Sequence, residues 1–374
     1  MKVVADDKIP FLKGVLEQYD IAVDYIAGAK TTTADLIGCD ALITRTRTKC
    51  NQALLAGSGV KFIATATIGF DHIDAEYARQ NNIFWTNAPG CNSSSVAQYM
   101  TSLLLNWAVK YGFSLQDKVL GVVGVGHVGS KVARVGEALG MKVLLNDPPR
   151  ARAEGAEKFV ELAEIIRQSD IITVHVPLEH NGSDPTYHLV DQAFLSQLAP
   201  HQLLVNASRG EVVDNAALRE ALKKRQLLAA ALDVWENEPA IDRELLDLLD
   251  YATPHIAGYS TDGKANGTSM SVRALAEFFG LSEDLKNWYP DNVPMPEKNL
   301  LVLPENGSLE ARLLAVISQS YNIADDTARL RNAPEEFEKL RGSYPLRREF
   351  HNYYVSGADG RIGGILEKLG FKSK

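Results

Sequence analysis

The stretch "VLGVVGVGHVGS", residues 119–130, decides the fold of this 374-residue chain. An apolar run, Val119–Val123, leads into glycines 124, 126 and 129, which are spaced as G-x-G-x-x-G and followed by a helical pattern. Gly124 permits a tight turn, Gly126 lets a pyrophosphate approach the backbone, and Gly129 lets the helix pack close to the strand. The free N–H groups that begin the helix then point at the phosphates. The sequence therefore predicts a dinucleotide-binding βαβ unit.

An acidic residue at the end of the next expected strand indicates which dinucleotide binds. The run "KVLLND" (142–147) ends in Asp147, within about twenty residues of Gly129. A carboxylate at this point accepts both ribose hydroxyls and repels a 2′-phosphate, so the pattern favours NAD over NADP. Arg150 lies close by and weakens that preference. A flavin site and a purely structural glycine turn are the alternatives to a nicotinamide site.

Short apolar runs around the motif alternate with amphipathic helical patterns, which is typical of a parallel sheet covered by helices. Asp214 is a good N-cap for the helix before the fifth strand. With Val119–Val123, six strands make a complete Rossmann-type NAD-binding domain, which we expect over residues 96–257. The other five expected strands are Lys142–Asn146, Ile171–Val174, Leu203–Asn206, Ala229–Val234 and Tyr251–Thr253.

The residues before 96 repeat this alternation and predict a second doubly wound domain, of flavodoxin-like type. A long helix in "NSSSVAQYMTSLLLNWAVKYG" (92–112), capped by the serines at 93–95, leads out of it. A helical stretch from Lys264 to Trp288 returns to it, so a discontinuous substrate-binding domain is expected from residues 1–95 and 258–287. Its expected strands are Val3–Ala5, Ala41–Thr44, Phe62–Ala66 and Ile83–Thr86.

The last part of the chain predicts a third, small α+β domain over residues 288–374. It begins with the proline-rich linker "WYPDNVPMPEKN" and ends with a basic run, "YPLRREFHNYY". Between them lie an expected strand near Leu300–Leu303 and expected helices around Leu309–Tyr321 and Ala324–Leu330. The fold class is thus α/β, with two doubly wound parallel-sheet domains and one small extra domain.

Composition excludes several classes of protein. Apolar residues make up 45% and charged residues 23% of the chain, and the net charge of −8 argues against a nucleic-acid partner. No apolar run approaches the roughly 18 residues that a membrane span needs, and charges interrupt the N-terminus, so we expect neither a membrane segment nor a signal peptide. Cys39, Cys50 and Cys91 are far apart and form no Cys-x-x-Cys pair. We therefore expect reduced thiols, no metal site and a cytoplasmic location.

Three polar residues follow successive strands of the expected NAD-binding sheet, at the carboxyl ends where ligands bind. They are Arg209 after "LLVN", Glu238 after "AAALDV" and His255 after "YAT". Singly, each has an ordinary interpretation: a surface charge, a turn residue before proline and a structural histidine. Together, an arginine fork binds a carboxylate, a histidine accepts a hydroxyl proton and a glutamate orients the imidazole. This set predicts oxidation of a 2-hydroxy acid, or the reverse reduction.

Over roughly residues 40–280 the chain resembles the D-2-hydroxyacid dehydrogenase family, through "ATATIGFDHID", "GVVGVGHVG", "VHVPL", "LLVNASRGEVVD", "ALDVWENEP" and "TPHIAGY". The resemblance implies an Arg209–Glu238–His255 triad and backbone N–H groups around Thr67–Gly69 that meet the substrate carboxylate. It also implies that Ser208, Asp233 and Gly258 touch the nicotinamide half of NAD. Close relatives often carry threonine at the position of Val176. Valine lacks the hydroxyl, so one possible contact to the cofactor is lost, but binding is not expected to be abolished. The full expected cofactor set is Gly124, Gly126, His127, Val128, Gly129, Asp147, Val176, Ala207, Ser208, Asp233 and Gly258.

A closer resemblance is to one branch of this family that acts on a phosphorylated 2-hydroxy acid. It is carried by "TRTRTKCN", "NAPGCNSSSVAQY", "LNDPPRA", "HIAGYSTDGKANGT" and "RREF". The resemblance implies Thr46, Thr67 and Tyr259 as substrate contacts, and a homodimer formed through the C-terminal domain. Because "TRTRTKC" follows the expected strand Ala41–Thr44, we predict that Arg45 and Thr46 bind the far end of the substrate. The next two cations in this run are expected to remain surface charges.

Two other functions stay open on the sequence. One is a phosphoglycerate- or glycerate-type dehydrogenase, although the C-terminal segment does not resemble the regulatory domain of such enzymes. The other is a non-catalytic NAD-sensing scaffold, which an intact triad does not exclude. Arg347 and Arg348 in "RREF" also have two interpretations: a solvated basic turn, or an arginine that crosses a dimer interface to the partner's substrate phosphate.

Overall fold

The computed structural model describes residues 1–358 and 360–373, and the chain forms two compact units. The first unit consists of Met1–Asn92 and Ser260–Pro294, and the second of Ser93–Tyr259 and Met295–Lys374. The first unit is thus discontinuous, because the chain leaves it at the long helix and returns to it after Tyr259.

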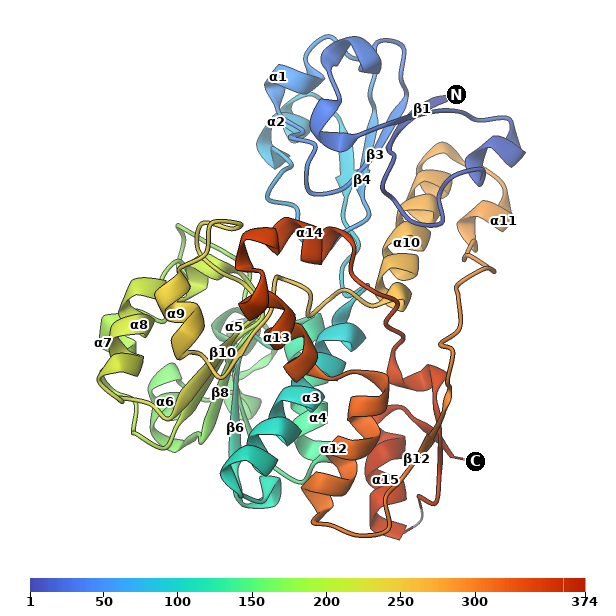
Figure 1. Ribbon diagram of the computed structural model, residues 1–374. Helices are drawn as coiled ribbons and strands as arrows, with labels where there is room; N and C mark the ends of the chain where they lie inside the picture. Colours follow the sequence, from blue (N-terminus) through green and yellow to red (C-terminus); the bar gives the residue numbers. More distant parts are fainter. Residues whose placement is uncertain (359, 374) are drawn as a thin grey trace. The chain divides into compact units, whose positions relative to one another are not determined.

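The first unit is built on a parallel five-stranded sheet with the order β2-β1-β3-β4-β5 (Figure 1). This order is that of flavodoxin-like sheets, so the predicted fold class is confirmed. We missed β2 in the sequence because it is an edge strand whose side chains are mostly half exposed and form no apolar run. The strands are β1 Lys2–Asp6, β2 Ala22–Ile26, β3 Ala41–Thr44, β4 Phe62–Thr65 and β5 Phe84–Thr86.

Helix α10, Thr261–Phe279, closes one face of this sheet. It starts where Ser260 Oγ accepts a hydrogen bond from Gly263 N at 2.8 Å. Its apolar residues Val272, Leu275 and Ala276 belong to the same buried cluster as strand residues of β1, β3 and β4. The other helices of this unit are α1 Gln52–Leu55, α2 Ala75–Gln80 and α11 Glu283–Lys286.

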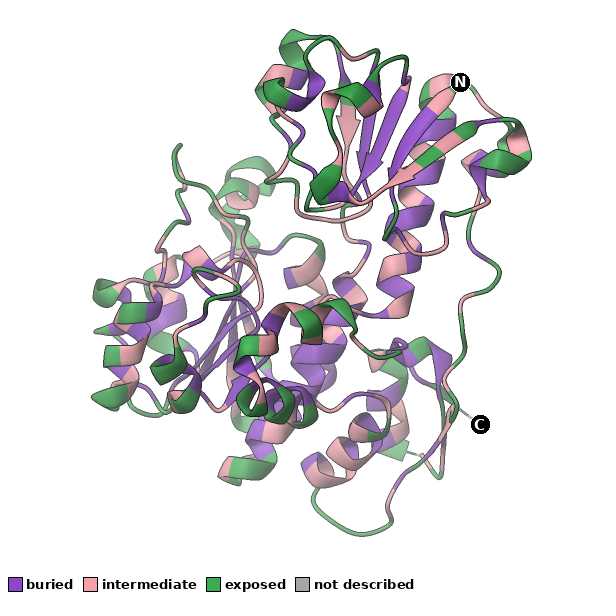
Figure 2. Ribbon diagram, turned by 45° about the horizontal axis from the view of Figure 1, so that its top comes forward, coloured by how far each residue is buried: buried purple, intermediate pink, exposed green. Residues whose placement is uncertain are grey.

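The second unit holds the predicted six-stranded parallel sheet, in the order β11-β10-β9-β8-β6-β7, and its strands other than the edge strand β7 are almost wholly buried (Figure 2). At the outer edge of β7, Val160 N donates to Leu145 O at 2.8 Å, so an extended segment stands where the third strand of the Rossmann order lies. The chain switches direction across the sheet between β6 and β8. The strands are β6 Val119–Val123, β7 Lys142–Asn146, β8 Ile171–Val174, β9 Leu203–Asn206, β10 Ala229–Leu232 and β11 Tyr251–Ala252.

Helices on both faces of this sheet connect its strands (Figure 1). The predicted N-cap at Asp214 is confirmed, since its side chain accepts from Ala217 N at 2.9 Å at the start of α8. The helices up to β11 are α3 Ser93–Tyr111, α4 His127–Ala138, α5 Pro148–Glu154, α6 Leu162–Gln168, α7 Gln192–Leu195, α8 Asn215–Lys223 and α9 Arg243–Leu248.

In its described residues, the C-terminal segment forms a small parallel sheet, β12-β13-β14, together with four α-helices. The sequence does not predict β13 and β14, because they contain one buried residue between them and form no apolar run. These elements are β12 Leu300–Val302, α12 Leu309–Ser320, α13 Ile323–Asn332, α14 Phe337–Gly342, β13 Tyr354–Ser356, α15 Gly360–Leu369 and β14 Lys372–Ser373.

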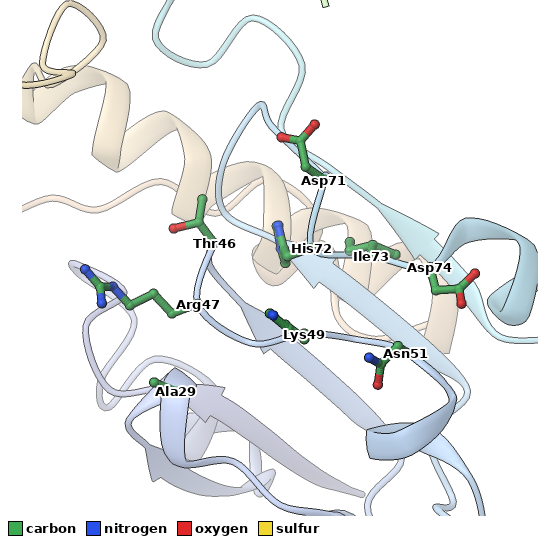
Figure 3. Close-up of a pocket in the computed structure, with 9 residues that line it drawn as sticks. All are labelled: Ala29, Thr46, Arg47, Lys49, Asn51, Asp71, His72, Ile73 and Asp74. Atoms are coloured by element: carbon green, nitrogen blue, oxygen red, sulfur yellow. The ribbon is translucent and has the colours of Figure 1, made fainter. Parts of the chain in front are cut away.

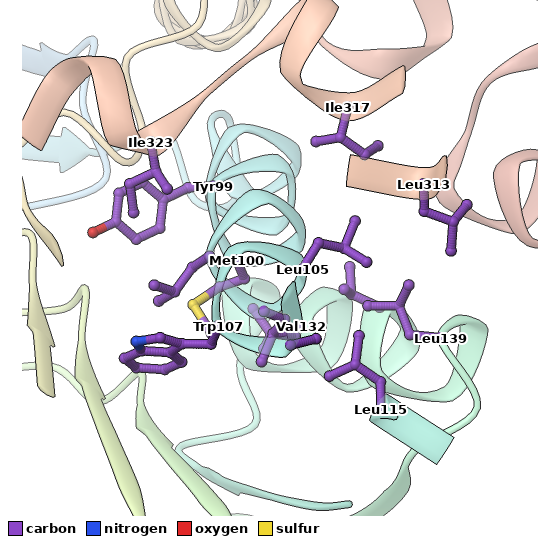
Figure 4. Close-up of a cluster of buried hydrophobic side chains, with 14 of the residues drawn as sticks. Tyr99, Met100, Leu105, Trp107, Leu115, Val132, Leu139, Leu313, Ile317 and Ile323 are labelled. Carbon is purple, nitrogen blue, oxygen red and sulfur yellow. The ribbon is translucent and has the colours of Figure 1, made fainter. Parts of the chain in front are cut away.

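This segment shares one hydrophobic core with the NAD-binding sheet, which differs from the expected separate domain over 288–374. Trp107 of α3, Val132 of α4, and Leu313 and Ile317 of α12 belong to one buried cluster (Figure 4). The physical reason is that α3 is buried on nearly all sides, since Leu103, Leu104 and Leu105 are buried in succession. A helix buried all round must be covered on more than one side, and α12 covers one of them.

No helix among residues 1–358 and 360–373 is long and apolar enough to cross a membrane.

Candidate active site

The glycine-rich loop after β6 has the geometry that a bound pyrophosphate requires. Gly124 has φ +83°, and a side chain there would lie 2.7 Å from His175 O. A side chain at Gly129 would lie 1.9 Å from Gly124 O, so only glycine lets α4 approach the strand. At Gly126, by contrast, an added Cβ would meet no atom within 4 Å. Gly126 is the N-cap of α4 and no side chain caps this helix, so its first N–H groups face open space.

Substituting these glycines should separate fold from cofactor binding. Gly129→Ala should lower both the melting temperature and NADH affinity, because its Cβ overlaps backbone. Gly126→Ala should leave the melting temperature within about 2 °C but weaken NADH binding by about tenfold or more, since its Cβ enters only the space for the phosphates. Thermal unfolding and NADH fluorescence titration measure the two effects. Equal NADH affinity in Gly126→Ala and wild type would contradict the predicted site.

Asp147 has a structural role as well as its predicted one. It is the N-cap of α5, where Oδ1 accepts from Arg150 N at 3.0 Å and Oδ2 accepts from Val125 N at 2.8 Å. The carboxylate is therefore fixed against the glycine loop. The guanidinium of Arg150 pairs with Glu154 at 2.7 Å and donates to Val125 O. Its hydrogen bonds therefore go to these two groups and not to the carboxylate of Asp147. This arrangement fits an acid presented to a ribose beside the loop.

The other predicted cofactor residues lie at the carboxyl ends of the later strands. Val176 follows β8, and its Cγ1 would lie 2.7 Å from a Cβ added at Gly124, so it packs against the glycine loop. Ala207 and Ser208 follow β9, and Ser208 Oγ donates to Asn206 Oδ1 at 2.9 Å. Gly258 follows β11. His127 and Val128 begin α4.

The structure gives Asp233 a role that the sequence did not indicate. Its carboxylate is 2% exposed and accepts hydrogen bonds from Thr253 Oγ1 at 2.6 Å, Ile256 N at 2.7 Å and Ala257 N at 3.0 Å. Burial raises the pKa of Asp233, and the nearby His255 and these donors only partly offset that rise. Asp233 therefore fixes the loop that follows β11, and its contact with the nicotinamide stays a prediction.

Glu238 and His255 form a close pair in the second unit. His255 Nδ1 lies 2.8 Å from Glu238 Oε2, and Glu238 Oε1 accepts from Trp235 N at 2.9 Å. Burial raises the pKa of Glu238, but the hydrogen bond and charge of His255, with smaller effects of the Trp235 N–H and of Arg341, outweigh it and hold the pKa below its ordinary value. An ionised Glu238 is an acceptor only, so Nδ1 carries the ring proton and Nε2 is left with its lone pair.

Arg209 stands on the neighbouring loop, after β9. Its Nη1 donates to Ser208 O at 2.8 Å. The loop packs closely on the one that carries Glu238, since a side chain at Gly210 would lie 2.0 Å from Trp235 O. The three predicted catalytic residues thus follow three adjacent strands, β9, β10 and β11, at the same edge of the sheet.

Two other histidines at this edge are poorer acid–base candidates. His188 also pairs with a carboxylate, Glu236, through Nε2 at 2.7 Å, but its Nδ1 faces Asp214 at 3.8 Å, so neither ring nitrogen is directed away from a carboxylate. Burial lowers the pKa of His175 to about 3, which keeps that imidazole neutral. Among residues 1–358 and 360–373, His255 Nε2 has no hydrogen-bond partner, so His255 fits the predicted role best.

The first unit presents backbone donors after β4. Among the residues described, no acceptor is bonded to the backbone N–H groups of Thr67, Ile68 or Gly69, while Thr67 Oγ1 lies 2.8 Å from Thr65 Oγ1 and donates to Gly69 O at 3.0 Å. These free donors agree with the expectation that this turn meets a carboxylate.

The run "TRTRTKC" is a turn, since β3 ends at Thr44, so its hydroxyls and cations do not alternate across a strand. Arg45 Nη1 donates to Lys8 O at 3.1 Å. Thr46 instead lines a pocket of about 630 Å³ together with Arg47 and Lys49, which we expected to be ordinary surface charges (Figure 3). The remaining lining residues are Ala29, Asn51, Asp71, His72, Ile73 and Asp74.

The C-terminal segment brings Arg341 and Arg347 close to the loop that follows β11 in the second unit, and the sequence had not indicated Arg341. The guanidinium of Arg341 lies 5.4 Å from the ring centre of Tyr259, the predicted substrate contact. Arg347 and Arg348 are 3% and 5% exposed, so the interpretation as a solvated basic turn is wrong. Their guanidinium groups bond within their own unit, to carbonyls near Tyr259 and to Asn352, which argues against a reach to a partner's phosphate.

Family models and solved structures of dehydrogenases match this chain. The family model described as D-isomer specific 2-hydroxyacid dehydrogenase, NAD binding domain, matches residues 96–257, and a model described as a domain of unknown function matches residues 293–370. The D-lactate dehydrogenase of Aquifex aeolicus, solved with NAD and lactic acid, matches with a TM-score of 0.63 and 27% identity, over 79% of this chain and 100% of that one. A NAD-dependent formate dehydrogenase of Staphylococcus aureus, solved with NAD, matches with a TM-score of 0.62 and 25% identity, over 79% and 98%.

Curated relatives match over the whole length. The erythronate-4-phosphate dehydrogenase of Bacteroides thetaiotaomicron is 48% identical over 96% of this chain and 99% of the relative. The enzyme of that name from Porphyromonas gingivalis is 42% identical over 100% of both chains. These relatives therefore include the C-terminal segment, whereas about a fifth of this chain lies outside the match to the D-lactate dehydrogenase.

Proposed function

Because the chain belongs to the erythronate-4-phosphate dehydrogenases within the D-isomer specific 2-hydroxyacid dehydrogenase family, we propose that it oxidises 4-phospho-D-erythronate. The product would be (R)-3-hydroxy-2-oxo-4-phosphooxybutanoate, formed in vitamin B6 biosynthesis. The observation that carries the chemistry is the Glu238–His255 pair, held at 2.8 Å on the loops that end β10 and β11. These loops lie at the same edge of the sheet as the glycine loop of an NAD-binding domain.

In this proposal, His255, Glu238 and Arg209 have separate roles in the reaction. When bound, NAD accepts the hydride from C2 of the substrate. His255 takes the proton of the C2 hydroxyl on Nε2, the nitrogen that Glu238 leaves unprotonated. The imidazolium that forms is stabilised by the ionised Glu238. The guanidinium of Arg209 binds the substrate carboxylate and draws charge from the C2 oxygen as it becomes a carbonyl.

Recognition of the phosphorylated end is part of the same proposal. Arg45, Thr46, Thr67 and Tyr259 are the proposed substrate contacts. Support comes from Thr46 lining a pocket whose wall holds the cations Arg47 and Lys49 beside the carboxylates Asp71 and Asp74. Each charge-assisted bond from such a cation to a phosphate contributes about 1.5–3 kcal/mol. A cytoplasmic location fits an enzyme that uses NAD. We also propose a homodimer through the C-terminal segment, where Val302 and Leu346 expose apolar side chains; a mass of 40.9 kDa in light scattering would refute it.

A substrate panel tests the proposed function. Purified protein with NAD should produce NADH from 4-phospho-D-erythronate with a kcat/KM about 100-fold or more above that for 3-phosphoglycerate or D-glycerate, because 3-phosphoglycerate lacks one carbon and D-glycerate lacks both that carbon and the phosphate. Absorbance at 340 nm follows the product. Faster turnover of 3-phosphoglycerate would favour the phosphoglycerate-type alternative. NADH binding without turnover of any acid would favour the scaffold.

A further inference from the structure

The segment after His255 is held from both sides by charged side chains of opposite sign. On one side Asp233 accepts the backbone N–H groups of Ile256 and Ala257 at 2.7 and 3.0 Å. On the other side the guanidinium of Arg347 donates to the backbone carbonyls of the same two residues, at 3.3 and 2.5 Å. All four polar groups of this dipeptide are therefore fixed by a carboxylate and a guanidinium.

The clamped dipeptide lies between His255 and the loop residues Gly258 and Tyr259, which are predicted to meet cofactor and substrate. His255 itself has φ +56°, a left-handed conformation that a non-glycine residue keeps only when its surroundings hold it. Its backbone N–H donates to Asp233 O at 2.7 Å. The clamp thus acts one residue beyond a strained position whose imidazole must stay aligned with Glu238.

Arg347 is a buried cation whose guanidinium contacts several parts of the second unit. It is 3% exposed, it stacks on the ring of Tyr321 at 4.3 Å, and it also donates to Ser95 O at 3.0 Å. In the described part of the chain its Nε has no hydrogen-bond partner. Its donors thus join the carbonyl of Ser95 at the start of α3 to those of Ile256 and Ala257 after β11. An apolar side chain of similar size could fill the same space, but it would leave these carbonyls without their donor.

We propose that Arg347 is a positioning residue for the dehydrogenase reaction, which with Asp233 clamps Ile256–Ala257 and so sets the His255 imidazole and Tyr259 in place. The C-terminal segment then has a catalytic purpose besides any part in dimerisation, because it supplies one half of the clamp. This inference rests on the proposed function for its kinetic readout, and on the geometry of the second unit for its structural readout.

The test compares Arg347→Met and Arg347→Lys with a matched control, Arg331→Met. Arg331 lies in the same segment and also donates to backbone carbonyls, those of Leu249 and Asp250, but at the opposite end of β11. Three quantities are measured on the full-length protein: kcat and KM, the NADH dissociation constant, and hydrogen–deuterium exchange of a peptide covering residues 254–260.

We expect Arg347→Met to lower kcat by about 10- to 100-fold, the range that misplacement of a reacting group produces, with KM and NADH affinity changed less than about threefold. Exchange in 254–260 should become faster. Arg347→Lys keeps the charge but lacks the planar pair of donors, so it should lie between Arg347→Met and wild type, and it serves alone if Arg347→Met does not fold. Arg331→Met should keep wild-type kcat and exchange in 254–260.

Equal loss of kcat in Arg347→Met and Arg331→Met, or unchanged exchange in 254–260 in both Arg347 variants, would overturn the proposal. The exchange measurement needs no substrate. If wild type fails to oxidise 4-phospho-D-erythronate, the proposed function falls, while faster exchange in the Arg347 variants alone would still establish the clamp.

Discussion

Replacing His255 with alanine should lower kcat by about 10³-fold or more while NADH binding stays within about twofold of wild type. The expected loss is large because the variant removes the group that is placed to take the hydroxyl proton as hydride leaves C2. The fold should survive, since the His255 ring is about 30% exposed and its hydrogen bond goes to the side chain of Glu238. NADH fluorescence and a 340 nm assay measure the two quantities.

His188→Ala is the matched control for this experiment. It removes a histidine that also pairs with a glutamate at the same edge of the sheet, with a side chain 28% exposed. Because both ring nitrogens of His188 face carboxylates, His188→Ala should keep kcat within about threefold of wild type. A loss in His188→Ala as large as that in His255→Ala would show that the wrong histidine has been assigned.

The pH dependence follows from the same pair. Oxidation needs Glu238 in its ionised form, because the carboxylate keeps the ring proton of His255 on Nδ1 and leaves Nε2 to take the hydroxyl proton. The pKa of Glu238 lies below its ordinary value, so the contribution of this carboxylate to kcat/KM should persist as the pH falls below the range in which an ordinary glutamate takes up its proton. Glu238→Gln removes the charge and should lower kcat across the pH profile, which the 340 nm assay measures.

The fold was predictable wherever the sequence carries a local pattern. Val119–Val123 and Ile171–Val174 are buried on both faces of the sheet, so they appear in the sequence as mostly apolar runs. The predicted first and last residues of both strands agree with the structure. Strand Ala22–Ile26 has no such run because it is an edge, and it was missed. The sequence also did not predict that Trp107 and Leu313 share one core, because they lie about two hundred positions apart and no local pattern indicates their packing.

The site divides in the same way. Arg209, Glu238 and His255 were predictable because parallel strands end at a common edge, so position after a strand is enough to group them. Asp233 was placed only by resemblance, and its hydrogen bonds to the loop after β11 depend on tertiary geometry. Arg347 was known as part of a basic run, but charge patterning indicates exposure, and here tertiary packing overrides it.

Replacing Arg209 with lysine should lower kcat/KM by about 100-fold, mainly through a higher KM for the hydroxy acid. Lysine keeps the positive charge but not the planar pair of donors that meets both oxygens of a carboxylate. The backbone around the site should be retained, because Asn206 Nδ2 bonds to the carbonyl of residue 209 and not to its side chain.

Arg209→Met should be more damaging still, since it removes the charge that stabilises the developing carbonyl as well as the carboxylate contact. Saturation kinetics with 4-phospho-D-erythronate, alongside NADH titration, separate the two roles. A raised KM with kcat retained in Arg209→Lys, followed by a fall of kcat in Arg209→Met, would assign carboxylate binding to the fork and transition-state stabilisation to the charge. If both variants kept wild-type KM and kcat, Arg209 would lie outside the substrate site, and the carboxylate would have to depend on the backbone donors at Thr67–Gly69.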